Sequence, residues 1–179
     1  MRSLVRVVAA VAHNRGLTAV LVAYGVFSAT QNAVWIAMLV YAYGRGGAGT
    51  AGAVAIAQLL PAALLAPVAA AMADRRSPVR VLVGGYLVQV AGMLATALAI
   101  GLEVPPAAYV GAVVASAAVA TTRPAQTVLV PGLVHNAEEL TAANALTGWI
   151  ESASLVASSA ATGLLLAVAG PGLVFAVAG

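Results

Sequence analysis

Long apolar stretches separated by short polar turns dominate the chain. Runs with few or no charged side chains reach the roughly 18–20 residues that a helix needs to cross ~30 Å of hydrocarbon. They predict five complete membrane spans and the beginning of a sixth, at residues 17–43, 51–73, 81–102, 106–128, 140–169 and 173–179. Helices are expected because hydrocarbon cannot satisfy the backbone groups of an open strand. We therefore predict an all-α membrane protein.

Glycine, proline and asparagine mark the turns of this pattern. Residues 44–49 form a short glycine-rich loop between the first two spans. Asn136 followed by Glu139 is close to a capping box at the start of the fifth span. Pro61 and Pro67 fall inside the second span, which we expect them to loosen or kink.

Arginine placement predicts the orientation of the bundle. If the spans alternate in direction, Arg45 lies alone at one face, and the other face receives Arg2, Arg6, Arg15, Arg75, Arg76, Arg80 and Arg123. Cytoplasmic loops are enriched in basic residues. We therefore expect residues 1–16 to form a cytoplasmic N-terminal segment of a multi-pass protein of the cell inner membrane.

Composition narrows the class further. The chain is 63% hydrophobic and only 7% charged, whereas about 25% charged residues would be expected of a soluble domain. The net charge of +3 comes from loop arginines rather than from a basic stripe, so a nucleic-acid partner is not expected. There is no cysteine, and the two histidines are isolated, which argues against a metal site. With no phosphate-binding glycine loop and no serine–histidine pair in one span, we expect neither an enzyme nor a cofactor.

The loop between the second and third spans carries a family pattern. Residues 70–80 read Ala-Ala-Met-Ala-Asp-Arg-Arg-Ser-Pro-Val-Arg. They resemble the signature loop Gly-x-Leu-Ala-Asp-Arg-x-Gly-Arg-Arg of the major facilitator superfamily, which lies between the second and third of twelve spans. The match keeps Ala73, Asp74 and Arg75. It departs at Ala70 and Ser77, where glycine is usual, and at Pro78 and Val79, where basic residues are usual, while Arg80 restores one charge.

A second resemblance extends along the chain. Residues 123–131 and 138–145 are similar to the connection between spans 4 and 5 of bacterial exporters in this superfamily, notably the macrolide-efflux-like group. The resemblance implies the N-terminal six-helix half of the fold, with the sixth span cut short. It also implies a second transporter half missing from this chain. The function implied is secondary active export of small hydrophobic or amphipathic molecules by alternating access around a midplane site.

The same resemblance assigns a role to the loop. In the family the loop contacts the second half and helps to set the inward–outward equilibrium. This implies a gating function for Asp74, Arg75, Arg76 and Arg80. The alternative is that these residues act only as a charge cluster that sets topology.

Four polar side chains inside the spans are candidates for the substrate cavity. Gln31 and Asn32 lie near the midpoint of the first span, one of the cavity-lining spans of the family; interhelical hydrogen bonding is the other interpretation. Glu151 is an intramembrane carboxylate, which is costly and usually functional. Its expected partner is Arg123, either in a static ion pair or in a titrating role.

The fifth span also carries a polar stripe. Ser154, Ser158 and Thr162 share a helical face with Glu151 and are expected to pack against neighbouring helices. In the family this region often holds an antiporter motif, which is degenerate here, because Ser158 and Ser159 replace its Gly-Pro pair. The alternative to a transporter is a small multi-span scaffold or assembly protein without transport activity.

Overall fold

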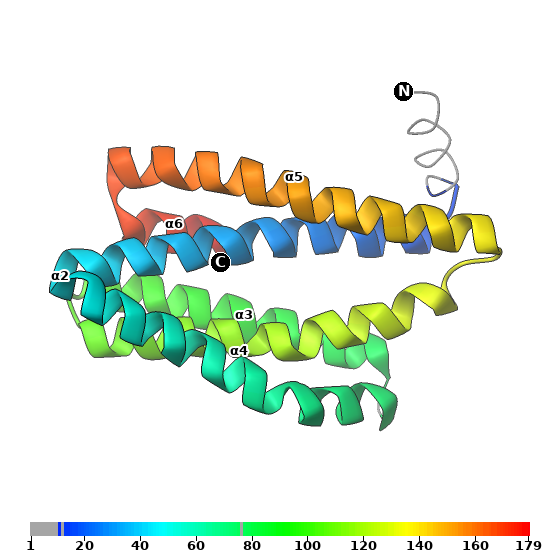
Figure 1. Ribbon diagram of the computed structural model, residues 1–179, viewed down its shortest axis with the longest axis horizontal. Coiled ribbons are helices and arrows are strands. Elements are labelled where there is room, and N and C mark those ends of the chain that lie inside the picture. Colours follow the sequence, from blue (N-terminus) through cyan, green and yellow to red (C-terminus); the bar gives the residue numbers. More distant parts are fainter. Residues whose placement is uncertain (1–10, 12, 76) are drawn as a thin grey trace.

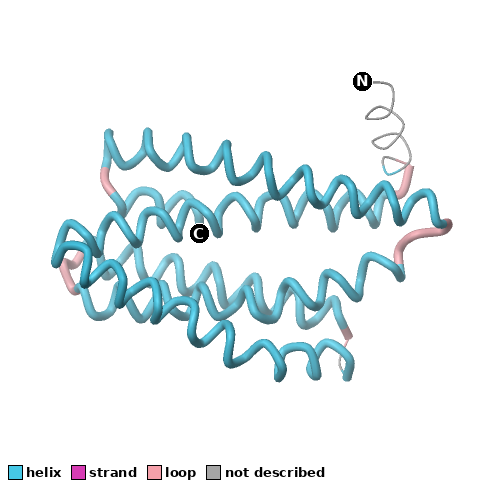
Figure 2. Tube along the Cα trace, viewed as in Figure 1, coloured by secondary structure: helices cyan, strands magenta, loops and turns pink. Residues whose placement is uncertain are grey.

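The chain is helical throughout the part that the structure describes. The computed structural model describes residues 11, 13–75 and 77–179, with the backbone alone at 62, 66, 68–70, 72–75, 120, 121 and 169. Its elements, labelled as in Figure 1, are α2 (Arg15–Arg75), α3 (Pro78–Gly101), α4 (Pro105–Leu129), the 3-10 helix η1 (Val130–Gly132), α5 (Ala137–Ala169) and α6 (Pro171–Ala178). Short turns join them (Figure 2). The predicted all-α class is confirmed.

Four of the described helical segments are long and apolar enough to cross a membrane. They are residues 15–65 of α2, the whole of α3, residues 105–132 and residues 137–168. Large apolar side chains are exposed along their outer faces, among them Leu98, Val110 and Val156. Such side chains would contact lipid tails favourably, whereas soluble proteins rarely expose so large an apolar surface to water. The molecule has the build of a multi-pass membrane protein.

α2 turns back on itself at two glycines. Gly46 (φ −153°, ψ 21°) and Gly47 (φ 65°, ψ −160°) are its residues with non-helical backbone angles. The angles of Gly47 belong to a region that essentially only glycine adopts. The first arm, residues 15–45, and the second arm, residues 48–75, therefore run in opposite directions (Figure 1). The sequence predicted separate helices at 17–43 and 51–73; both are present as arms, but the loop between them shrinks to two residues.

The prolines of the second arm do not interrupt the helix. Pro61 and Pro67 lie inside α2, and the helical backbone angles continue through both. A loosened or kinked helix was predicted here; the non-helical angles of α2 are confined to the glycine pair, while the second arm changes direction along its length (Figure 1). A proline removes one backbone hydrogen bond, and a membrane helix tolerates this where local adjustment satisfies the freed carbonyl.

The start of α5 forms as the sequence predicted. The N-cap Asn136 accepts a hydrogen bond through Oδ1 from the backbone N–H of Glu139 at 2.8 Å. The Glu139 carboxylate accepts from the backbone N–H of His135 at 2.9 Å, one residue before the donor of a standard capping box. The Asn14 side chain donates to the carbonyl of Leu133 at 2.6 Å. This contact ties the beginning of α2 to the turn before α5.

Successive helical rods alternate in direction through the bundle. The first arm of α2 lies with α5 and α6, while its second arm lies with α3 and α4 (Figure 1). The starts of α2 and α3 and the end of α4 share one end of the molecule, and the bend of α2 lies at the other. Arg15, Arg80 and Arg123 therefore belong to the first end and Arg45 to the second. The predicted separation of arginines holds for these four; orientation and membrane type stay predictions.

The tightest crossing joins α3 to α4 through small residues. A Cβ atom added at Gly92 would lie 2.8 Å from the backbone nitrogen of Ala115 and 2.9 Å from the carbonyl oxygen of Gly111. Thr96 donates its hydroxyl to the carbonyl of Gly92 at 2.8 Å. Beside this contact a core cluster brings together both arms of α2, α3, α4 and α6, with Met38, Met93 and Phe175 almost fully buried. The close backbone approach holds α4 against α3, and the core cluster holds both helices against α2.

Candidate functional site

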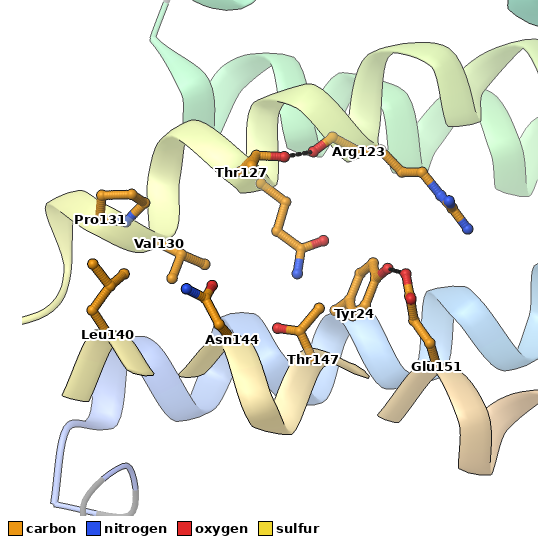
Figure 3. A pocket seen from close by; sticks show the side chains of 10 residues that line it. Tyr24, Arg123, Thr127, Val130, Pro131, Leu140, Asn144, Thr147 and Glu151 are labelled. Atoms are coloured by element: carbon orange, nitrogen blue, oxygen red, sulfur yellow. Dashed lines mark hydrogen bonds between the residues drawn. The ribbon is translucent and has the colours of Figure 1, made fainter. Parts of the chain in front are cut away.

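A polar pocket of 480 Å³ lies between α2, α4 and α5 (Figure 3), nearer the arginine-rich end of the bundle, since its lining includes the end of α4 and the start of α5. Three helices and η1 supply its lining: Tyr24 from α2; Arg123, Gln126 and Thr127 from α4; Val130 and Pro131 from η1; and Leu140, Asn144, Thr147 and Glu151 from α5. Most of these side chains are polar, although all come from segments with the composition of membrane spans. Polar groups grouped inside such spans are a functional-site hypothesis on physical grounds.

Glu151 has a partner on α2. The hydroxyl of Tyr24 donates a hydrogen bond to Oε1 of Glu151. Tyr24 is only 4% exposed and Glu151 is half-buried. At ~1.5 Å per residue, Glu151 lies about 21 Å along α5 from its first residue. The bond satisfies a buried tyrosine hydroxyl and a carboxylate that would otherwise be unpaired at this depth.

A close approach of α2 and α5 sets the position of this pair. Gly25 follows Tyr24, and a Cβ atom added to Gly25 would lie 3.3 Å from Cγ2 of Ile150. Its carbonyl accepts a hydrogen bond from Oγ of Ser154 at 3.3 Å. A glycine at position 25 and a serine one turn after residue 150 thus let the two helices touch where Tyr24 meets Glu151.

Arg123 faces the same pocket from α4. Its side chain is exposed and extends into the opening, where Tyr24 and Glu151 lie across from it (Figure 3). Within the described residues the one ion pair joins His135 to Glu139 at 3.2 Å. Arg123 and Glu151, predicted to be partners, therefore share the pocket without pairing. The carboxylate bonds to tyrosine instead, because α2 lies closer to α5 at this level than α4 does.

Amide and hydroxyl groups complete the lining. The amide of Asn144 and the hydroxyl of Thr147 point into the cavity (Figure 3). Gln126, on the opposite wall, is buried, and its side chain also lines the pocket. In the described part of the chain, the side chains of Arg123, Gln126 and Asn144 have neither a hydrogen-bond partner nor an ion-pair partner. The pocket therefore offers one guanidinium and two amides to a ligand or to water.

The structure leaves two of the predicted cavity residues outside this pocket. Gln31 and Asn32 are half-buried on the first arm of α2 and do not line it. They lie seven and eight residues beyond Tyr24, or about 10 Å farther along the helix at ~1.5 Å per residue. Their predicted role in a cavity thus stays a prediction.

The polar stripe of α5 packs against its neighbours as predicted. Ser154, Ser158 and Thr162 are all buried. Ser154 contacts α2 through the carbonyl of Gly25, and Ser158 donates weakly to the carbonyl of Leu155 within its own helix at 3.4 Å. None of the three lines the pocket. Glu151 is therefore the member of the stripe that reaches the cavity.

The predicted gating loop lies largely outside what can be described. Asp74 and Arg75 end α2, and only their backbone is described; Arg76 lies outside the described residues. Arg80 is exposed in the first turn of α3, which begins after the N-cap Ser77. The gating role of this loop stays a prediction.

Sequence reasoning missed eight of the ten residues that line the pocket, five of them polar: Tyr24, Gln126, Thr127, Asn144 and Thr147. Tyr24 carried a signal, because a tyrosine deep in an apolar span needs a partner for its hydroxyl. Gln126, Thr127 and Asn144 fall within the two stretches that resemble exporter sequences, 123–131 and 138–145. Their convergence on Glu151 required knowing which faces of α4 and α5 meet.

Comparisons of the chain with protein-family models, with curated proteins and with solved structures give no match. The chemistry of the pocket therefore has to be argued from its own groups. It can accept hydrogen bonds at Glu151, donate hydrogen bonds from a guanidinium and from amides, and receive apolar atoms against Val130, Pro131 and Leu140.

Proposed function

We propose that the chain is the N-terminal half-bundle of a secondary active transporter resembling the major facilitator superfamily, and that it exports small hydrophobic or amphipathic molecules. The observation that carries the proposal is the pocket between α2, α4 and α5, in which Arg123 and Glu151 face a common cavity without pairing. Charged groups at such depth are retained at a cost in stability, and they usually serve a transport path.

Further support comes from the alternating rods and from the loop pattern around Asp74. A bundle of this kind works by rocking against a second bundle, so that the pocket opens to one face of the membrane at a time. The proposed transporter includes a second half that is missing from this chain, and the loop 74–80 adjusts the equilibrium between the two openings. The protein would reside in the cell inner membrane with its arginine-rich end in the cytoplasm.

The test is dye transport in everted membrane vesicles from cells that express the complete natural gene. Two amphipathic dyes, cationic ethidium and anionic fluorescein, report on substrate charge. We expect energy-dependent accumulation of at least one dye, lost in Arg123→Gln and in Glu151→Gln. Arg45→Gln, at the opposite end of the bundle, is the matched control and should retain transport. Two results together would favour the scaffold hypothesis: vesicles that transport neither dye, and Arg123→Gln and Glu151→Gln variants whose only effect is a lower stability of the protein.

A further inference from the structure

An apolar hollow lies between the first arm of α2 and α5, apart from the polar pocket. It has a volume of 300 Å³, and its lining is Val11, Thr18, Leu21, Val22, Gly25, Leu146 and Ile150. None of these residues lines the polar pocket. The hydroxyl of Thr18, the one polar side chain among them, donates to the carbonyl of Val11 at 3.0 Å. The lining therefore leaves no polar side chain for water to solvate.

The hollow continues along α2 to an arginine. Thr18 and Val22 also line a neighbouring depression, together with Arg15, Ala19 and Ala23. We call the hollow and this depression the α2–α5 groove. Gly25 lies ten residues beyond Arg15, or about 15 Å along the helix at ~1.5 Å per residue. This is half of the ~30 Å thickness of the hydrocarbon. The groove is therefore as deep as one leaflet, with Arg15 where the helix begins.

Arg15 is available to an anion. It is exposed at the first residue of α2, and within the described residues its guanidinium has neither an ion pair nor a hydrogen bond. Glu139 approaches the neighbouring Asn14 at 3.4 Å, but its carboxylate is bonded to the backbone N–H of His135 at 2.9 Å. A guanidinium offers donors in a planar fork that matches a phosphodiester. An anionic head group therefore complements this end of the groove.

We propose that the α2–α5 groove binds an anionic phospholipid, with the phosphodiester at Arg15 and one acyl chain against Leu21, Val22 and Ile150. The proposal is independent of the transport function. Three features select this occupant: the apolar lining suits hydrocarbon, the depth suits one leaflet, and the unpaired guanidinium suits a phosphate. A membrane helix of another chain would satisfy the apolar lining alone.

Such a lipid would cover the contact that positions Tyr24 against Glu151. Gly25 and Ile150, where α2 and α5 approach each other closely, line the groove. Tyr24 and Glu151, next to them in the sequence, line the polar pocket instead. Val22 is 61% exposed, so the groove is open to the surroundings of the bundle, from which lipid can enter. The lipid would therefore be a neighbour of the pocket without occupying it.

The experiment uses Trp149 as the reporter. The chain has two tryptophans, so Trp35→Phe leaves Trp149, which is 44% exposed and adjoins Ile150 in the sequence. In nanodiscs that hold the whole chain, its fluorescence is quenched by phosphatidylglycerol or by phosphatidylcholine, each with brominated acyl chains. We expect phosphatidylglycerol to bind at Trp149 at least about fivefold more tightly, a difference of ~1 kcal/mol. Equal binding of the two lipids at Trp149 would overturn the proposal.

A matched position separates the groove from general attraction of anionic lipid to arginine. Leu87 lies seven residues beyond Arg80 on α3, as Val22 lies seven residues beyond Arg15 on α2, and Leu87 is 65% exposed. Neither Arg80 nor Leu87 lines the groove. With Leu87→Trp as the single tryptophan, we expect a weaker preference for phosphatidylglycerol than at Trp149. A preference as strong as that at Trp149 would reduce the effect to surface attraction and would overturn the proposal.

Two further pairs of variants assign the effect to residues. Arg15→Gln should remove the preference at Trp149, whereas Arg80→Gln should retain it. Val22→Phe fills the groove and should lower quenching by phosphatidylglycerol. Val26→Phe is its matched control, because Val26 is also 61% exposed but does not line the groove. Equal effects within either pair would contradict the assignment.

The same measurements detect a protein in the groove. If neither lipid quenches Trp149 while both quench Leu87→Trp, a protein segment such as a second copy of the chain covers the groove, and the lipid proposal fails. If Trp35→Phe does not fold, native mass spectrometry of the unmodified chain and of Arg15→Gln counts the lipids retained from a mixture. The unmodified chain should retain more phosphatidylglycerol than Arg15→Gln, and equal retention would overturn the proposal.

Discussion

At the scale of single residues, the pocket depends on the hydrogen bond between Tyr24 and Glu151. Neither residue by itself indicates that the other is its partner. Glu151 needs a donor at its depth, and Tyr24 needs an acceptor for its hydroxyl. Each would be an expensive buried polar group without the other. Arg123 stands apart from this pair, so the carboxylate is held in place without being neutralised.

Tyr24→Phe should lower the stability of the protein, since it removes the donor and leaves the Glu151 carboxylate unsatisfied. We expect a loss of about 1–3 kcal/mol, measured as reversible unfolding in detergent. Tyr43→Phe is the matched control, because Tyr43 is 62% exposed, and it should change little. Combined with Glu151→Gln, Tyr24→Phe should cost less than the sum of the two single changes. Additive losses would show that the hydrogen bond contributes nothing measurable.

Asp74→Asn tests the loop. If Asp74 sets the balance between inward and outward openings and does not contact substrate, this change should reduce dye transport and leave equilibrium ligand binding within a few fold. Transport of the dye is measured in everted vesicles and its binding in nanodiscs, with the same variant in both. A loss of binding as large as the loss of transport would contradict a gating role.

At the scale of elements, glycines decide where helices turn and where they touch. Gly47 allows the reversal of α2 through backbone angles that other residues rarely adopt, and Gly92 allows the backbones of α3 and α4 to approach. The prolines of α2 have the weaker effect, because helical angles continue through them.

Gly47→Ala should destabilise the protein although there is room for the added methyl group. Nothing lies within 4 Å of a Cβ atom at this position, so the cost comes from φ 65° alone. A value of about 1–3 kcal/mol is expected for a non-glycine residue in this region. Gly52→Ala, also in open space but at helical angles, should be neutral or slightly stabilising. Unfolding of both variants in detergent gives the comparison, and equal effects would refute the backbone argument.

Gly92→Ala tests the crossing of α3 and α4. The new Cβ atom would meet backbone atoms of α4 at 2.8 and 2.9 Å, which cannot rotate away as a side chain would. We expect the helices to separate at a cost of about 1–3 kcal/mol, as in other overpacked contacts. Gly84→Ala, on the same helix with no atom within 4 Å, is the control and should unfold like the unmodified protein. If the two variants unfold alike, the crossing is looser than described.

At the scale of the whole molecule, alternating rods collect arginines at one end. Arg15, Arg80 and Arg123 belong to that end, and Arg45 belongs to the other. Because basic residues accumulate on the cytoplasmic side, this end should face the cytoplasm. The pocket would then lie nearer the cytoplasmic face, from which an exporter takes its substrate.

Single cysteines test this topology, because the chain has none of its own. Ser77→Cys and Ala48→Cys occupy exposed turns at opposite ends of the bundle. In intact cells a membrane-impermeant maleimide should label Ala48→Cys and should reach Ser77→Cys only after the membrane is opened. Labelling of both from outside would reject the alternating arrangement, and the reverse pattern would invert the orientation.

Much of the architecture could be predicted from the order of residues. The helix class follows from long apolar runs, because hydrocarbon leaves the backbone no partner other than itself. The start of α5 follows from Asn136 and Glu139, since capping is a contact within one turn. The reversal near Gly47 was foreseeable for the same reason, although its length of two residues was not.

The site was decided only by tertiary structure. Glu151 and Arg123 were recognisable as costly charges, but the sequence pointed to each as the partner of the other. Which faces of α2, α4 and α5 meet depends on close contacts between residues far apart in the chain, such as Gly25 with Ile150. Those contacts bring Tyr24 to Glu151 and leave Arg123 across the cavity. Short-range patterns determine what each helix is, and packing between distant segments determines which of its side chains share a pocket.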